Sequence, residues 1–368
     1  MYKVLFTSDY EIHGSGMGSP KELVVDPTTR MLDQFDIYGA KLTIMADIGE
    51  ILKFKEYAET RGDDRFGWGA IAAQLQRSVR TGHDVQLHIH SSYFNATWNE
   101  SKQAWIQDYS EYDLANLPYE RVRDMIVRGK KLLEETCRKA KPDYECYVFR
   151  AANWSMQPSP SIVKALVDEG FRIDTSVWKY GRYDDLVKFD YSNAHSDLVP
   201  WPIDSKNVCE RDPSGKLFEF PIYTERQPLW VFLTPNRVYR VIAQRLNPLP
   251  EPDPMDGGAA PSSGVRASLP GRLLGKATKA MSRHPWKVDF NQCTGRQLID
   301  ALKRVEARYG HPSVPLPFVL IGHSKTFTAH NERSLRPFLE FVRDNPSRFS
   351  FGTFADFEPE KYREPVAA

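Results

Sequence analysis

Short apolar segments alternate with amphipathic segments along most of the chain, and this alternation limits the fold more than any other feature. Runs such as 2–7 and 84–90 have the length and composition of buried strands, whereas 68–82 has helical spacing and ends at a glycine. Strands that alternate with helices are typical of a parallel sheet with helical crossovers, either open or closed into a barrel. At 368 residues, one large α/β barrel and two packed domains are both compatible with the length. Further strands are expected within 39–49, 144–154, 216–225 and 315–327. Further helices are expected over 28–38, 115–140 and 294–310. A helix followed by a strand is expected within 159–177.

The composition excludes several classes of protein. The chain has 49 Lys and Arg against 48 Asp and Glu, so its formal net charge of +1 gives no electrostatic reason to expect binding to nucleic acid. Its 4 cysteines lack CxxC spacing, which argues against a disulfide framework and a structural zinc site. No basic and apolar leader precedes the first strand, and no apolar run could span a bilayer, so a cytoplasmic location is expected.

One segment interrupts the alternation. Residues 246–270 are rich in Pro, Gly, Ala and Ser, and we expect a flexible insertion over 246–290. Within it, residues 271–286 form a basic amphipathic run. This run is interpreted either as a helix that packs on the protein surface or as a peripheral contact with a membrane.

Two carboxylates follow the first apolar strand, in the segment TSDYE. Asp9 and Glu11 are two residues apart, so their side chains share a face of an extended chain. Their mutual repulsion requires a nearby cation, an arginine or a shared proton, unless the segment is simply a solvated turn.

Two histidines end a later strand, in the segment VQLHIH. His88 and His90 point to the same side of an extended strand. They form either the polar face of a solvated strand or a pair of metal ligands.

Three other strand ends carry polar residues with chemical potential. Arg150 follows an apolar strand in FRAANW, where it can orient a carboxylate through two hydrogen bonds. In the same loop, Trp154 could stack on a sugar ring or belong to the core. His323 ends PFVLIGH, where a general acid with a pKa near neutrality would be useful. Asp174 ends FRID.

Taken together and in this order, these segments resemble the NodB-type polysaccharide deacetylases, which form carbohydrate esterase family four. The resemblance covers most of the chain, from Tyr2 to about Phe354, and excludes 246–290. It implies a distorted (β/α)7-type barrel in which residues 1–368 form a single catalytic domain. It also implies a divalent metal, usually Zn²⁺, held by one carboxylate and two histidines.

The resemblance also implies roles for individual residues. Asp9 would be the catalytic base, Arg150 would position it, and His323 would be the acid. Asp174 would support the charged network. The metal ligands that it implies are Glu11, His88 and His90. The substrate-binding residues that it implies are Asn153 and Trp154.

The sequence departs from the family pattern at three places. The usual adjacent aspartates are replaced by Asp-Tyr-Glu, so Asp9 and Glu11 could exchange roles. The usual second histidine, four residues after the first, is replaced by Ser92, which leaves His90 as the substitute. A usual proline is replaced within Ala-Ala-Asn, residues 151–153. These departures indicate a divergent branch.

The resemblance favours hydrolysis of the N-acetyl group of an amino sugar. With the expected location, it indicates a nucleotide-linked or lipid-linked precursor of a surface polysaccharide. The alternatives are a metal-dependent hydrolase of an amide that is not a sugar, and a non-catalytic protein that binds carbohydrate. The intact set of Asp9, Glu11, His88 and His323 argues against the non-catalytic reading.

Overall fold

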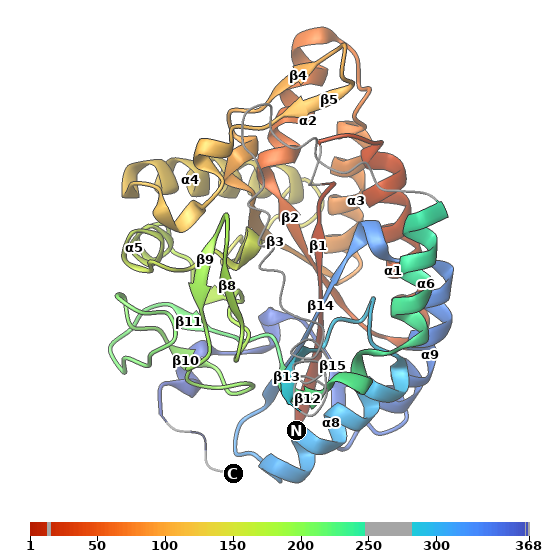
Figure 1. Ribbon diagram of the computed structural model, residues 1–368. Helices are drawn as coiled ribbons and strands as arrows, with labels where there is room; N and C mark the ends of the chain where they lie inside the picture. The colour runs from red at the N-terminus through yellow and green to blue at the C-terminus, as the bar shows by residue number, and fades with distance from the viewer. Residues whose placement is uncertain (13–15, 247–281, 365, 367–368) are drawn as a thin grey trace, which may run out of the picture.

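The computed structural model describes residues 1–12, 16–246, 282–364 and 366. Its main feature is a nine-stranded sheet with the order β10-β11-β7-β6-β3-β2-β1-β14, in which β15 also pairs with β1 (Figure 1). The strands are β1 Tyr2–Tyr10, β2 Leu42–Asp47, β3 Asp84–Ile89, β6 Val148–Ala151, β7 Ile173–Asp174, β10 Trp201–Pro202, β11 Phe218–Glu219, β14 Leu316–His323 and β15 Phe349–Phe351.

The sheet curls into a distorted barrel. Strands β14, β1, β2, β3, β6, β7 and β11 run parallel to one another, and the edge strand β10 is antiparallel to β11. Just after β11, Ile222 forms a β-bridge with Val319 of β14. This bridge brings the segment that follows β11 against β14, at the opposite end of the strand order. The α/β barrel class expected from the sequence is therefore confirmed. In such a sheet the carboxyl ends of the strands meet at one end of the barrel.

Helices surround this sheet (Figure 1). Helix α8 shows why the sequence forms them: the Thr294 side chain accepts from the Gln297 N–H, Gln297 caps Thr294 in return, and the apolar side chains at helical spacing are buried. The helices are α1 Asp26–Tyr38, α2 Ile48–Arg61, α3 Trp68–Arg80, α4 Tyr119–Cys137, α5 Pro160–Asp168, α6 Pro235–Leu246, α8 Gly295–Tyr309 and α9 Ala329–Arg343. None of the helices in the described ranges is long and apolar enough to cross a membrane.

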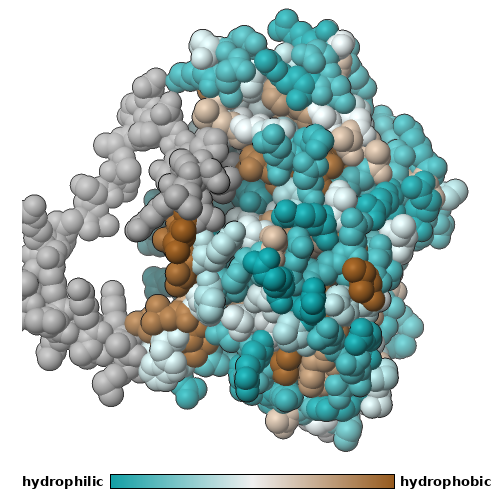
Figure 2. Space-filling view, turned by 90° about the vertical axis from the view of Figure 1, so that its right-hand side faces the viewer, coloured by the Kyte–Doolittle hydropathy of each residue, from teal (hydrophilic) through white to brown (hydrophobic). Residues whose placement is uncertain are grey.

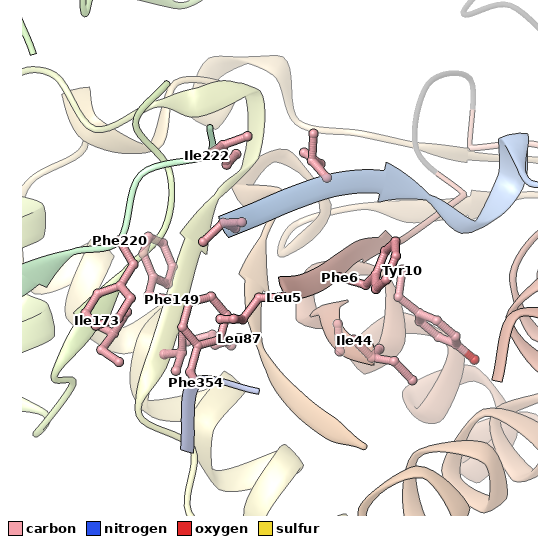
Figure 3. Packing of buried hydrophobic residues seen from close by; sticks show 14 of the residues in the cluster. Leu5, Phe6, Tyr10, Ile44, Leu87, Phe149, Ile173, Phe220, Ile222 and Phe354 are labelled. Atoms are coloured by element: carbon pink, nitrogen blue, oxygen red, sulfur yellow. The ribbon is translucent and has the colours of Figure 1, made fainter. Parts of the chain in front are cut away.

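The core fills the inside of the curled sheet and the layer between sheet and helices. Figure 3 shows side chains from several strands in this core, among them Leu5 of β1, Leu87 of β3 and Phe149 of β6. Every residue of β2 is buried, as expected of a strand covered on both faces. The four cysteines are free and buried in this core.

Several elements differ from the sequence-based expectation. The expected strand at 216–225 is divided into β11 and the start of β12 Thr224–Pro228. The C-terminal end of the expected insertion is ordered as β13 Arg283–Lys287, which pairs with β12 because extended backbone there finds hydrogen-bond partners. Residues 247–281, which include most of the basic run 271–286, lie outside the described residues. Two further hairpins are present, β4 Thr97–Asn99 with β5 Ala104–Ile106, and β8 Arg182–Asp184 with β9 Lys188–Asp190.

Candidate active site

The strand register brings the predicted residues together at the carboxyl end of the barrel. Asp9 of β1 is the register partner of His323 of β14, and His88 of β3 is the partner of Arg150 of β6. A cavity of about 280 Å³ opens at this end. It is lined by Asp9, Glu11, His88, His90, Ala151, Asn153, Trp154, Arg240, Gln292, His323, Lys325 and Thr326.

Glu11, His88 and His90 form a compact group of possible metal ligands. Glu11 Oε2 lies 3.2 Å from His88 Nε2 and 2.7 Å from His90 Nε2. One ligand atom from each residue lies within 4.8 Å of the other two, and all three residues are buried. One carboxylate and two imidazoles are donors suited to Zn²⁺, and three protein ligands leave room for water or substrate.

The surroundings hold both histidines in place. His88 Nδ1 lies 2.9 Å from the carbonyl oxygen of Arg150, and a hydrogen bond there places the proton on Nδ1 and leaves the Nε2 lone pair for a metal. The backbone N–H of His90 donates to Asp47 Oδ1 (3.0 Å). Gly49 passes so close to His90 that a Cβ at position 49 would lie 2.6 Å from the His90 carbonyl oxygen. The donor set therefore fits a divalent metal.

Lys325 fixes the Glu11 carboxylate. Its Nζ lies 2.9 Å from Glu11 Oε1, which leaves Oε2 facing the two histidines. Burial raises the pKa of Glu11, but Lys325 and the two histidines outweigh burial and hold that pKa well below its usual range. Glu11 is therefore ionised, as a metal ligand must be.

Asp9 has a different set of partners. Its Oδ1 accepts a hydrogen bond from Arg150 Nη1 (2.7 Å), and its Oδ2 lies 3.6 Å from His323 Nε2. Burial raises the pKa of Asp9, but Arg150, His88 and His323 together lower that pKa below its ordinary value. Asp9 is thus an ionised carboxylate beside the metal-ligand group, able to accept a proton.

Arg150 is completely buried and directs Asp9. Its Nη2 donates to Thr7 Oγ1 (2.8 Å) and its Nε donates to the Thr175 carbonyl oxygen (3.0 Å). The guanidinium is therefore held on several sides, and its charge compensates the buried Asp9 carboxylate. Arg150 thus contacts the Asp9 carboxylate through one hydrogen bond instead of the expected two, because Thr7 accepts from its other terminal nitrogen.

His323 lies at the rim of the cavity, with its side chain 28% exposed. Its backbone N–H donates to Asn291 Oδ1 (2.8 Å). Gly322 permits this approach, because a Cβ at position 322 would lie 2.2 Å from the Phe290 ring and 2.5 Å from Asn291 Oδ1. The glycine before His323 in LIGH is thus required by close packing.

Asn153 and Trp154 form a strained part of the cavity wall. Both have left-handed backbone conformations, with φ of 51° and 61°, which are unfavourable for residues with side chains. Tyr191 donates its hydroxyl to the Trp154 carbonyl oxygen and stabilises this loop. Lys287 Nζ lies 4.1 Å from the Trp154 ring centre, and burial lowers the pKa of Lys287 to about 8. Consecutive strained residues at a cavity often mark a functional site.

A second cavity of about 230 Å³ continues from this wall. It shares Asn153 and Trp154 with the first cavity, and the β8–β9 hairpin forms its other side. Its other lining residues are Tyr112, Trp178, Arg182, Tyr183, Leu186, Val187 and Phe189. Aromatic faces in such number suit stacking against the apolar faces of a ring.

Asp174 forms a buried pair with a second carboxyl. It is the register partner of Glu219 on β11, and both side chains are completely buried. Asp174 Oδ1 also accepts from Ser176 Oγ (2.7 Å), which in turn accepts from the Ala151 N–H (2.8 Å). Asp174 thus supports the backbone that follows Arg150. Burial raises the pKa of Asp174, and burial with the neighbouring carboxyl raises the pKa of Glu219 well above its ordinary value.

Glu219→Gln is expected to make the free energy of unfolding less dependent on pH. In the folded protein Glu219 keeps a proton that the unfolded chain releases above about pH 4.5. The stability due to this proton is fully present at lower pH and is lost as pH rises through the folded-state pKa. The glutamine amide is neutral at every pH and has no such proton to lose. At about pH 8 the variant should therefore exceed the wild type in free energy of unfolding by about 1 kcal/mol or more.

Urea unfolding at several pH values measures this difference. Glu358→Gln, a change at an exposed carboxylate, is the matched control and should follow the wild-type pH profile. Identical profiles for Glu219→Gln and wild type would show that folding does not raise the pKa of Glu219.

Some residues of the site were not predicted from the sequence. Asp47 ends the apolar strand β2 and lies beside its register partner His88, so the strand-end pattern could have found it. Lys325 lies in the turn after His323, where no spacing rule indicates that it reaches Glu11. Ser92, which stands where the family has its second histidine, donates instead to Gln107 Oε1 (2.8 Å).

Comparisons with known proteins support the fold. No protein-family model matches the chain, and no curated protein does. Among solved structures, a branching enzyme of GH57 type from Pyrococcus horikoshii superposes with a TM-score of 0.50 at 11% identity, over 97% of this chain and 70% of that one. A protein described as a polysaccharide deacetylase from Mycobacterium smegmatis gives a TM-score of 0.48 at 14% identity, over 98% of this chain and 91% of that one. A Puue allantoinase gives 0.46 at 13% identity, over 98% and 89%. Identities this low bear on the fold alone.

Proposed function

We propose that this protein is a metal-dependent deacetylase that hydrolyses the N-acetyl group of an amino sugar. The observation that carries the proposal is the composition of one cavity. A buried group of one carboxylate and two histidines lies beside Asp9, a separate carboxylate held by Arg150, and His323 lies at the rim. A metal site, a base and an acid are the groups that metal-dependent amide hydrolysis uses.

Glu11, His88 and His90 would hold the metal, and their donor atoms favour Zn²⁺. When bound, such a metal polarises a carbonyl group and lowers the pKa of water. Asp47 and the Arg150 carbonyl oxygen keep the two histidines oriented for this purpose. Because Glu11 contacts both imidazoles, we assign the ligand role to Glu11 and the base role to Asp9.

Asp9 then takes the proton of the attacking water. The lowered pKa of Asp9 keeps it in the unprotonated form that a base requires, and Arg150 keeps Oδ2 directed into the cavity. His323 Nε2 lies 3.6 Å from Asp9 Oδ2, whereas Arg150 binds Oδ1. His323 protonates the amine as the carbon–nitrogen bond breaks. The two proton transfers thus use two groups that face the same small space.

A sugar is the substrate that the walls favour. Trp154 and Asn153 lie between the cavity with the metal-ligand group and the aromatic cavity. A chain of two or more rings could place one ring at each, since aromatic side chains stack on sugar faces. We further propose that the sugar is carried by a nucleotide or a lipid, as a precursor of a surface polysaccharide.

Acetate release tests the proposal directly. The purified protein should release acetate from at least one member of a panel of N-acetylhexosamines, offered as free oligosaccharides and as nucleotide-linked or lipid-linked forms, and added Zn²⁺ should restore the activity of chelated protein. Rates should rise from one ring to two, because the aromatic cavity is then filled. Hydrolysis of non-sugar amides with no acetate from any sugar would replace this proposal by the alternative amide hydrolase.

A further inference from the structure

Helix α6 has its polar and apolar faces reversed relative to an ordinary surface helix. Such a helix normally buries an apolar stripe and exposes its polar side chains. In α6, Asn236 is buried and Arg237 and Arg240 are partly buried, whereas Val238 and Val241 are exposed. The apolar side of α6 is therefore exposed to water unless a partner covers it.

The polar face of α6 attaches the helix to the rim of the proposed active site. Asn236 Nδ2 donates to the Cys293 carbonyl oxygen (2.8 Å), and Asn236 Oδ1 accepts from His330 Nε2 (2.8 Å) on α9. Just before the helix, Thr234 Oγ1 donates to the carbonyl oxygen of Gln292 (2.7 Å), a residue that lines the cavity. These hydrogen bonds hold the polar side of α6 against the rest of the protein, and the apolar side therefore points outward.

The outward face continues onto the short 3-10 helix η6 Leu229–Phe232 that precedes α6. Trp230 is 67% exposed and Leu233 is 81% exposed. Figure 2 shows hydrophobic, brown surface gathered along one side of a view that is otherwise mostly teal. We define the apolar face of α6 as Leu229, Trp230, Leu233, Val238, Val241 and Ile242, all of which are exposed large apolar side chains.

The charge around this face is mainly positive, since Glu225 of β12 is already paired with Arg304 (2.8 Å). The sequence from 226 to 246 has 4 arginines and no Asp or Glu. Strand β13, which pairs with β12 beside η6, adds the exposed Arg283 and no acidic residue. An exposed apolar stripe with Trp, bordered by the exposed Arg226 and Arg283, complements the interface of an anionic bilayer.

We propose that the apolar face of α6 binds the surface of an anionic lipid bilayer. Trp230 and Leu233 would enter the headgroup region, where tryptophan is favoured, and the exposed Arg226 and Arg283 would pair with lipid phosphates. Arg240, on the same helix, lines the cavity that holds Asp9 and Glu11. Binding through this face therefore brings the mouth of the cavity close to the membrane, where a substrate carried on a lipid could reach it. The contact lies at 229–242 and is separate from the basic run 271–286.

Sedimentation with lipid vesicles tests this proposal without any measurement of turnover. The full chain should sediment with vesicles of phosphatidylglycerol and phosphatidylcholine, and less with phosphatidylcholine alone or at high salt. The double variant Trp230→Ser/Ile242→Ser should partition at least about tenfold more weakly, since two large apolar side chains no longer enter the interface. Arg283→Glu should weaken binding to anionic vesicles alone.

Ile37→Ser is the matched control. Ile37 on α1 is 73% exposed and lies outside the apolar face of α6, so its replacement should leave sedimentation unchanged. Thermal unfolding of each variant shows that it is folded. The proposal is overturned if the full chain does not sediment, or if Ile37→Ser weakens binding as much as the double variant. It is also overturned if light scattering shows a dimer that the double variant dissociates, in the absence of vesicle binding, because the face would then join two copies of the chain.

Discussion

Asp9→Asn is expected to lower kcat about a thousandfold or more while the metal content of the protein stays the same. Asparagine keeps the shape of the side chain but cannot take a proton from water. Asp9 contacts Arg150 and His323, whereas Glu11 contacts the two histidines, so loss of the Asp9 charge leaves the proposed ligand atoms in place. Acetate release and elemental analysis of the same preparation measure the two effects.

A stability measurement must accompany this variant. The buried Arg150 guanidinium would face a neutral amide, so the free energy of unfolding should fall, by about 2–4 kcal/mol, although Thr7 and the Thr175 carbonyl oxygen still accept from Arg150. Rates are therefore compared at a temperature where both proteins are folded. If Asp9→Asn lost the metal and Glu11→Gln kept it, the two carboxylates would have the opposite roles.

His88→Ala is expected to remove both the metal and the activity. The variant loses one of three ligand atoms, and its affinity for Zn²⁺ should fall by more than about a hundredfold, since loss of a mere supporting hydrogen bond already costs up to that much. His90→Ala should behave in the same way, because His90 Nε2 approaches Glu11 Oε2 even more closely. Competition with a chromophoric chelator measures the affinity, and acetate release measures the activity.

His311→Ala is the matched control for both variants. His311 is exposed and lies outside the cavity, so its removal should change neither the bound metal nor the rate. A His90→Ala protein with full metal affinity would show that the second imidazole ligand is not His90. Full turnover by His88→Ala after exhaustive chelation would exclude a metal-dependent reaction.

The position of His90 near Glu11 could be predicted from the sequence only in part. The family pattern places a second histidine at position 92, where this chain has Ser92. Alternation along a strand predicts only that His88 and His90 lie on one side. Strand β3 ends at Ile89, and the turn that follows is held by Asp47 and packed against Gly49, which brings His90 to Glu11. These contacts come from β2 and α2, so the sequence around the histidines could not reveal them.

The roles of the two carboxylates were likewise decided by tertiary contacts. Both were predicted to lie at the end of β1, and they do. Glu11 lies one residue beyond the strand, where alternation no longer determines the direction of a side chain. Lys325 holds its Oε1, and Arg150 holds Asp9 on the other side, so the two carboxylates point to different partners. Both cations are more than a hundred residues away in the chain.

The sequence by itself determined the fold class and the end of the barrel at which the polar residues gather. Both follow from local rules: apolar periodicity defines strands and helices, and parallel strands direct their carboxyl ends the same way. The tertiary structure alone decided which side chains meet within that region and which face of α6 is exposed. Amphipathic spacing predicts a helix whichever face turns inward, and in α6 the long-range bonds of Asn236 to Cys293 and His330 determine that it is the polar one.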